Sequence, residues 1–87
     1  MNNAKEVIYQ FKSKWKEELI CRCELGEICL EFVMGVPTVY LPTENQWKNL
    51  APVWARKHWQ RLHDQLQTWC QAGGFALVLD ETATVIF

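Results

Sequence analysis

The chain has 87 residues, the size of one small domain, so we expect residues 1–87 to form a single domain. Apolar residues make up 49% of the sequence and charged residues 22%, so the chain can build a dense core and lacks the composition of a disordered protein. The net charge of −1 leaves no excess of positive charge to hold a polyanion or an anionic membrane surface.

The first periodic stretch predicts an amphipathic helix over residues 4–17. Its apolar side chains recur at helical spacing, at Ala4, Val7, Ile8, Phe11 and Trp15. Asn2 or Asn3 can cap its start, because a short polar side chain accepts a hydrogen bond from the first free amides of a helix. We therefore expect this segment to bury one face against the rest of the domain.

The period changes to two in ICRCELGEICLEF, residues 20–32, which predicts a β-hairpin. The Gly-Glu pair at 26–27 suits a two-residue type II′ turn, whose first central position needs the positive φ that glycine tolerates. The register that follows places the apolar side chains on one face. It also sets Arg22 opposite Glu31 as a cross-strand ion pair.

A third strand is predicted over residues 38–41, TVYL. If Gly35 and Val36 form the turn before it, Val39 faces Phe32 on the apolar side. The three strands would then form an antiparallel meander.

A long helical segment follows the sheet. Thr43 with Gln46 three residues later is a capping-box pattern, and Pro52 should separate a short first turn from a main helix over residues 51–72. The expected buried stripe of this helix is Ala55, Trp59, Leu62, Leu66 and Trp69. The glycine pair at 73–74 marks its end.

The chain closes with FALVLD and ATVIF, residues 75–80 and 83–87, which predict a second hairpin. Both faces of these strands are apolar, so they are either sandwiched or expose an adhesive surface. The predicted element order is α-β-β-β-α-β-β. It describes an α+β domain with an antiparallel sheet and the two helices packed on one face.

The α-β-β-β-α part of this order resembles that of double-stranded-RNA-binding domains. The second helix of that family begins with a basic cluster, whereas here the segment begins with TENQ, residues 43–46. The resemblance therefore implies no RNA contact for this chain.

Three of the four cysteines lie close together in the predicted hairpin, at Cys21, Cys23 and Cys29. Zinc sites favour two cysteines separated by two to four residues, because both thiolates must turn toward one ion. Here strand alternation sends Cys29 to the face opposite Cys21 and Cys23, and Cys70 lies in the second helix. We expect reduced core thiols and no bound metal, with a metal-stabilised domain as the alternative.

A catalytic constellation is also missing from the sequence. His58 and His63 are the two histidines, and their spacing of five places them on different sides of a helix. Cys70 is two helical turns from His63, too far for a hydrogen bond within that helix. No glycine-rich phosphate loop or nucleophile elbow occurs. We therefore expect a protein that is not an enzyme and needs no cofactor.

The second helix carries the most distinctive surface. WARKHWQRLH, residues 54–63, combines basic and aromatic side chains, which is typical of protein interfaces and of nucleic-acid-binding surfaces. A plain solvated helix face with tryptophans anchored in the core is the competing interpretation. The candidate interaction surface consists of Trp47, Trp54, Arg56, Lys57 and Arg61.

These observations predict a small non-enzymatic protein-interaction module. Its partner would be a second copy, joined through the strands within residues 75–87, or another protein. The alternative is a nucleic-acid-binding module that uses Trp54, Arg56, Lys57 and Arg61. Residues 1–19 hold scattered charges and no apolar run of signal-peptide length, so we expect a soluble, cytoplasmic protein that binds no membrane.

Overall fold

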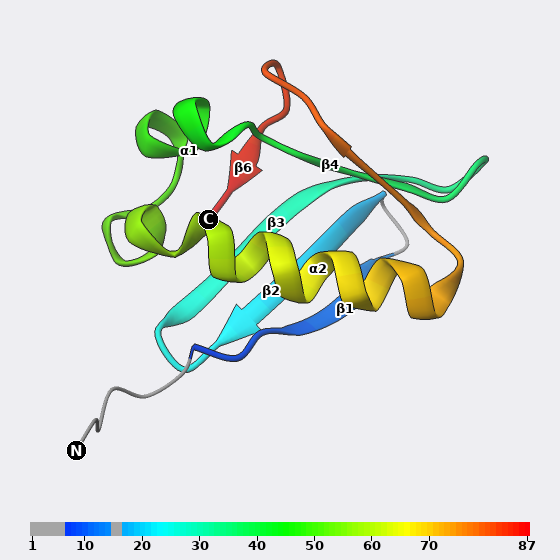
Figure 1. The fold of residues 1–87 in the computed structure, drawn as a ribbon, viewed down its shortest axis with the longest axis horizontal. Helices are drawn as coiled ribbons and strands as arrows, with labels where there is room; N and C mark the ends of the chain where they lie inside the picture. Colours follow the sequence, from blue (N-terminus) through cyan, green and yellow to red (C-terminus); the bar gives the residue numbers. More distant parts are fainter. Residues whose placement is uncertain (1–6, 15–16) are drawn as a thin grey trace.

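The computed structural model describes residues 7–14 and 17–87 and shows an α+β domain, as predicted (Figure 1). The described elements, in chain order, are β1 (Gln10–Lys14), β2 (Glu18–Cys23), β3 (Gly26–Val33), β4 (Thr38–Leu41), α1 (Glu44–Leu50), the 3₁₀ helix η1 (Val53–His58), α2 (Trp59–Gly73), β5 (Ala76–Leu79) and β6 (Val85–Ile86). The predicted element order is therefore wrong, because four strands precede the helices.

The sheet runs in the order β1-β2-β3-β4-β5, and β6 pairs with β3 beside β4. Strands β1 to β4 are antiparallel neighbours, whereas β5 runs parallel to β4. Parallel neighbours need a crossover connection, which α1, η1 and α2 supply here. The predicted C-terminal hairpin is wrong for this reason, since β5 and β6 pair with different strands of the main sheet.

The predicted helix over residues 4–17 is also wrong where the structure describes it, because residues 10–14 form the edge strand β1. Phe11 lies opposite Cys21 in the antiparallel ladder with β2, and Tyr9 is buried. Phe11 fits both the predicted helical stripe and a period of two, whereas an inward Tyr9 two residues earlier fits only a strand, which pairs with β2. The proposed caps at residues 2–3 and the stripe positions at 4 and 15 lie outside the described residues.

The β2–β3 hairpin exists, but its turn is at residues 24–25 and Cys23 pairs with Gly26. Arg22 therefore faces Glu27, with 2.7 Å between Nη2 and Oε1, and the predicted pair of Arg22 with Glu31 is wrong. The pairing differs from the prediction by an even number of residues. Each side chain consequently keeps its predicted face of the sheet.

A close contact with a tryptophan explains the place of Gly26. A Cβ atom at this position would lie 2.7 Å from Cε2 of Trp54, so the strand must begin with a residue that has no side chain. Gly26 therefore accommodates the Trp54 indole, which packs over the end of the hairpin, and does not serve as a central turn residue.

Several local signals are confirmed. Val39 lies opposite Phe32, and the side chain of Thr43 accepts a hydrogen bond from the Gln46 amide at the start of α1. Gly74 adopts the left-handed conformation, with φ 76°, at the end of α2. The proline break occurs, but residues 53–58 form a 3₁₀ helix, so the main α-helix begins later than predicted, at Trp59.

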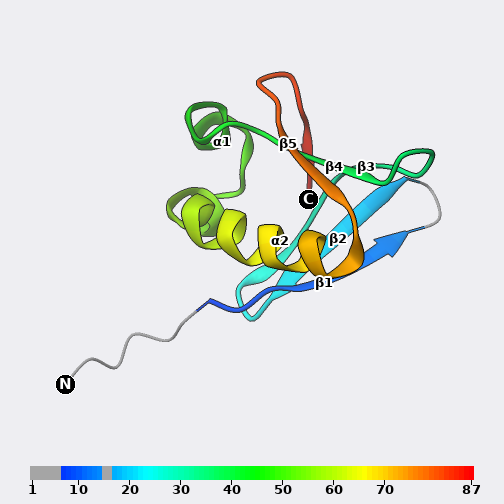
Figure 2. The ribbon, with the colours of Figure 1, turned by 45° about the vertical axis from the view of Figure 1, so that its right-hand side comes forward.

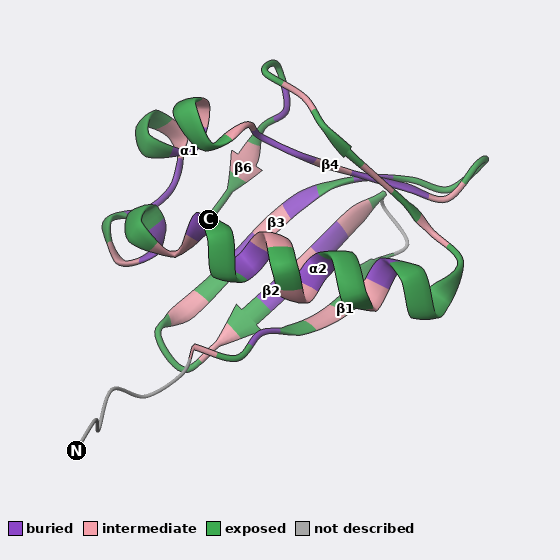
Figure 3. Cartoon of the chain, in the orientation of Figure 1, coloured by how far each residue is buried: buried purple, intermediate pink, exposed green. Residues whose placement is uncertain are grey.

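The core lies between α2 and the sheet (Figures 2 and 3). Helix α2 contributes Trp59, Leu62, Leu66 and Cys70, which meet the inward side chains of β2, β3 and β4. Trp69, expected on the buried stripe, is half-buried, and Cys70 takes the inner position. Among the described helices, none is long and apolar enough to span a membrane.

Replacing Gly26 with alanine should destabilise the fold by about 1–3 kcal/mol, because the new methyl group overlaps the Trp54 indole. Chemical denaturation measures the change. Gly35→Ala is the matched control, since nothing lies within 4 Å of a Cβ built there. Equal effects of the two substitutions would contradict the proposed contact.

Candidate functional site

The structure places Trp47 in the core, which corrects its assignment to a surface. Its side chain is fully buried, and its Nε1 donates a hydrogen bond to the Ala55 carbonyl at 2.8 Å. Trp59 is anchored in the same way, by a bond of 2.8 Å to the Pro42 carbonyl. The Trp47 indole joins α1 to η1, and the Trp59 indole joins the start of α2 to the segment before α1, so neither is available to contact a partner.

The other candidate residues do not form one patch. Trp54 is half-buried against Gly26, and Nε of Arg56 donates to the Ala51 carbonyl at 3.2 Å near the end of α1. Lys57 and Arg61 are exposed and line one open groove. The groove has a volume of about 740 Å³, and its lining is Lys57, His58, Gln60, Arg61, Asp64 and Gln65.

An ionised carboxylate lies within this basic groove. His63 contacts Asp64 at 3.1 Å and Gln60 donates to it at 2.9 Å, and these hydrogen bonds lower the pKa of the Asp64 carboxyl. The ring of His63 also stacks on Trp59, with centroids 5.1 Å apart. The groove therefore sets the Asp64 carboxylate beside Lys57 and Arg61, which weakens its attraction for polyanions.

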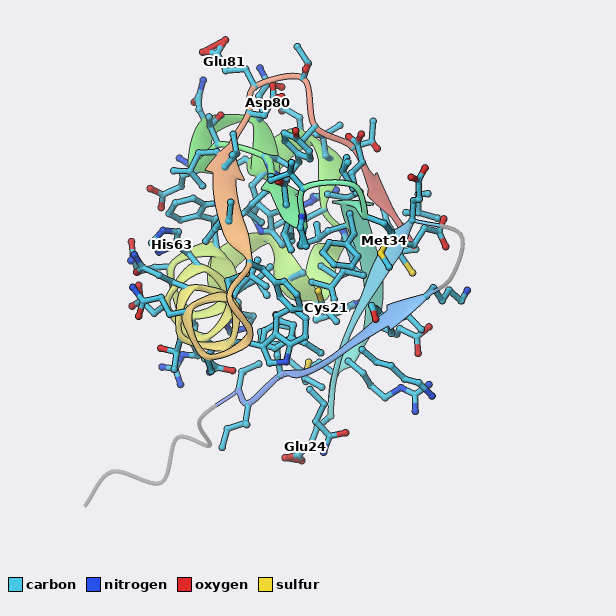
Figure 4. The ribbon with its side chains drawn as sticks, turned by 90° about the vertical axis from the view of Figure 1, so that its right-hand side faces the viewer. Cys21, Glu24, Met34, His63, Asp80 and Glu81 are labelled. Carbon is cyan, nitrogen blue, oxygen red and sulfur yellow. The ribbon has the colours of Figure 1, made fainter. Side chains whose placement is uncertain are left out.

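The cysteines are distributed as predicted across the two faces of the sheet. Cys21 points into the layer between α2 and the sheet (Figure 4), whereas Cys29, which lies opposite Ile20 in the ladder, occupies the other face. Burial raises the pKa of the Cys21, Cys29 and Cys70 thiols, so these groups stay protonated and poorly nucleophilic near neutral pH. Within residues 7–14 and 17–87, no three His, Cys, Asp or Glu side chains are grouped to hold a metal ion.

An aromatic groove of about 660 Å³ lies between residues 8–11 and the C-terminal half of α2. Its lining includes Phe11 and Trp69, whose ring centroids are 5.7 Å apart. Gln65, which also lines the groove, accepts a hydrogen bond from the Tyr9 amide at 2.7 Å and donates one to the Val7 carbonyl at 2.6 Å. Gln65 thus binds residues 7–9 as a neighbouring strand would, a role that no sequence pattern indicated.

The sheet face opposite α2 carries no helix in the described part of the chain (Figure 2). A partly exposed apolar row crosses its middle, where Ile20 pairs with Cys29 and Cys29 pairs with Ile86. Charged pairs flank this row, including Lys14 with Glu18 at 3.7 Å. Such mixed surfaces are common on antiparallel sheets that face water on one side.

The two edges of the sheet differ sharply in chemistry. The β1 edge carries Lys12 and Lys14, and charged side chains of this kind protect an edge from pairing with other chains. The β5 edge has the sequence ALVL, without charge or proline, and exposes Val78 and Leu79 at 39% and 46%. No described strand pairs with its outer side.

Backbone amides of β5 are available at this edge. The amides of Ala76 and Asp80 donate toward β4, to the Pro37 and Leu41 carbonyls at 2.9 Å each. Because amide direction alternates along a strand, the peptide groups of Leu77 and Leu79 point away from β4. The β5 edge is therefore an apolar strand with outward-facing hydrogen-bonding groups, and it is the strongest candidate site on the described surface.

No protein-family model matches the chain, and neither a curated protein nor a solved structure matches it significantly. The candidate site therefore rests on the geometry of this chain alone.

The turn after β5 should respond to pH through Asp80 (Figure 4). Its carboxylate accepts hydrogen bonds from the amide and the hydroxyl of Thr82, both at 2.8 Å, which lower the pKa of Asp80. A lowered folded-state pKa stabilises the fold above the usual value near 3.8, and this contribution is lost as the pH falls through the folded pKa.

Replacing Thr82 with valine should move the Asp80 pKa upward toward its usual value, because one of the two donors is removed. NMR titration of the Asp80 carboxyl carbon measures the shift. Thr68→Val, which removes a hydroxyl from the surface of α2, is the control and should leave that titration unchanged. An unshifted Asp80 pKa in Thr82→Val would contradict the assignment.

Proposed function

We propose that this chain is a small non-enzymatic protein-interaction module that binds its partner through the free edge of β5. The observation that carries the proposal is the contrast between the two sheet edges. The lysines of β1 protect one edge, whereas β5 combines exposed aliphatic side chains with outward-facing peptide groups at Leu77 and Leu79.

Adding a strand to an open sheet edge is a recurrent mode of protein recognition. The main-chain hydrogen bonds supply affinity, and alternate side chains on the two faces supply selectivity. At β5 these side chains are Val78 on the face opposite α2 and Leu77 on the other, because Val78 is the partner of Tyr40 and Leu77 that of buried Val39. A partner strand would therefore carry apolar side chains on both faces.

Affinity capture from the cells that make the protein, followed by reconstitution with purified components, tests the proposal. The captured protein should bind Val78→Lys at least about tenfold more weakly than wild type, because a lysine at an edge opposes strand pairing. Val53→Lys is the matched control, since Val53 is 76% exposed and lies on η1. Unchanged binding by a folded Val78→Lys variant would contradict the proposal.

Nucleic-acid binding is the second candidate function, because Lys57 and Arg61 are exposed together in one groove, although Asp64 in that groove opposes it. Lys57→Glu and Arg61→Glu should then weaken binding to mixed RNA or DNA. They should also reduce its salt dependence, because each lysine or arginine that contacts a phosphate releases counterions. Fluorescence anisotropy over a salt series measures both effects. Lys48→Glu, an exposed substitution on α1, serves as the control. Absence of binding at low salt would contradict this candidate.

A further inference from the structure

We infer that the partner at the β5 edge is a second copy of this chain, joined by antiparallel β5-to-β5 pairing about a two-fold axis at Val78. This inference rests on the proposed function and specifies both the partner and the register. It follows from the peptide groups of β5, from its side chains and from the chemistry of the opposite edge.

The available peptide groups determine the register. Leu77 and Leu79 are the β5 residues whose amides and carbonyls face outward, since Ala76 and Asp80 donate toward β4. A two-fold partner satisfies them when Leu77 of one copy lies opposite Leu79 of the other. Each of these pairs then exchanges both of its N–H···O=C bonds, as in any closely hydrogen-bonded antiparallel pair. Val78 consequently lies opposite its own counterpart on the axis.

The side chains of β5 are compatible with this register. Val78 would meet Val78 on the face opposite α2, and leucines would meet on the helix face, so exposed aliphatic surface is removed from water on both sides. The charged residue that follows the strand, Asp80, comes opposite the small Ala76. Its carboxylate already accepts two hydrogen bonds from Thr82, so it does not compete for the new pairing.

The β1 edge makes β5-to-β5 pairing more favourable than the other two ways in which copies of this sheet could pair. Two β1 strands would bring Lys12 and Lys14 of each copy close together, which like-charge repulsion opposes. Pairing of β1 with β5 would be head-to-tail and would leave free edges that continue to add copies. Pairing of β5 with β5 closes after two copies and leaves the lysine-protected β1 strands at both ends of the combined sheet.

Charge complementation at the axis tests the inference. In Val78→Lys and in Val78→Glu, like charges lie directly opposite each other, so each variant alone should dimerise at least about tenfold more weakly than wild type. An equimolar mixture places Lys opposite Glu and should regain dimers. Light scattering and sedimentation over a concentration series measure the masses, with Val53→Lys as the control that dimerises like wild type.

Amide hydrogen exchange on the wild-type chain gives a readout that needs no variant. Exchange at Leu77 and Leu79 should slow as concentration rises, whereas exchange at exposed residues of the 34–37 turn should not change. A wild type that stays monomeric, or a mixture that does not recover dimers, would overturn the second-copy inference. If a different captured protein still depended on Val78, the proposed function would stand while this inference failed.

Discussion

The structure depends on the burial of one side of α2 against the sheet. Leu62, Leu66 and Cys70 recur at helical spacing and are almost fully buried against side chains from β2, β3 and β4. Removing this apolar surface from water is the largest favourable contribution available to a chain of this size. Through hydrogen bonds to backbone carbonyls, the Trp47 indole joins α1 to η1, and the Trp59 indole joins the start of α2 to the segment before α1. Each of these side chains therefore holds the helical crossover in a single position over the sheet.

That position decides which surfaces remain open. After α2 has crossed the sheet, Gly74 reverses the chain and β5 returns beside β4 in the parallel direction. Among the described elements, the strand lies at the edge because β6, which follows it, pairs with β3. An apolar strand in the middle of a sheet would only contribute to the core, whereas the same strand at an edge offers unpaired peptide groups. The candidate site is therefore a consequence of the crossover and not of a motif in β5.

The strands were harder to predict than the main helix, because helix boundaries depend on nearby residues and strand pairing does not. Thr43, Pro52 and Gly74 act within one or two turns of their own position, and the structure shows each effect near the predicted place. The predicted interaction surface was wrong at Trp47, which is buried. Whether a tryptophan in an amphipathic segment faces the core depends on contacts with residues far away in the sequence. Gln65 likewise gave no sequence signal, since its bonds join residues that are 56 and 58 positions apart.

The sequence alone determined the α+β class, the period-two alternation that separates Cys21 from Cys29, and the glycine stop of the main helix. These features follow from backbone geometry and from neighbours in the chain. Only the tertiary structure decided that residues 10–14 form a strand, that the hairpin turns at 24–25, and that β5 and β6 separate. The physical reason is that a strand can pair with any of several segments that are distant in the sequence. Packing over the whole domain makes that choice, and local periodicity does not specify it.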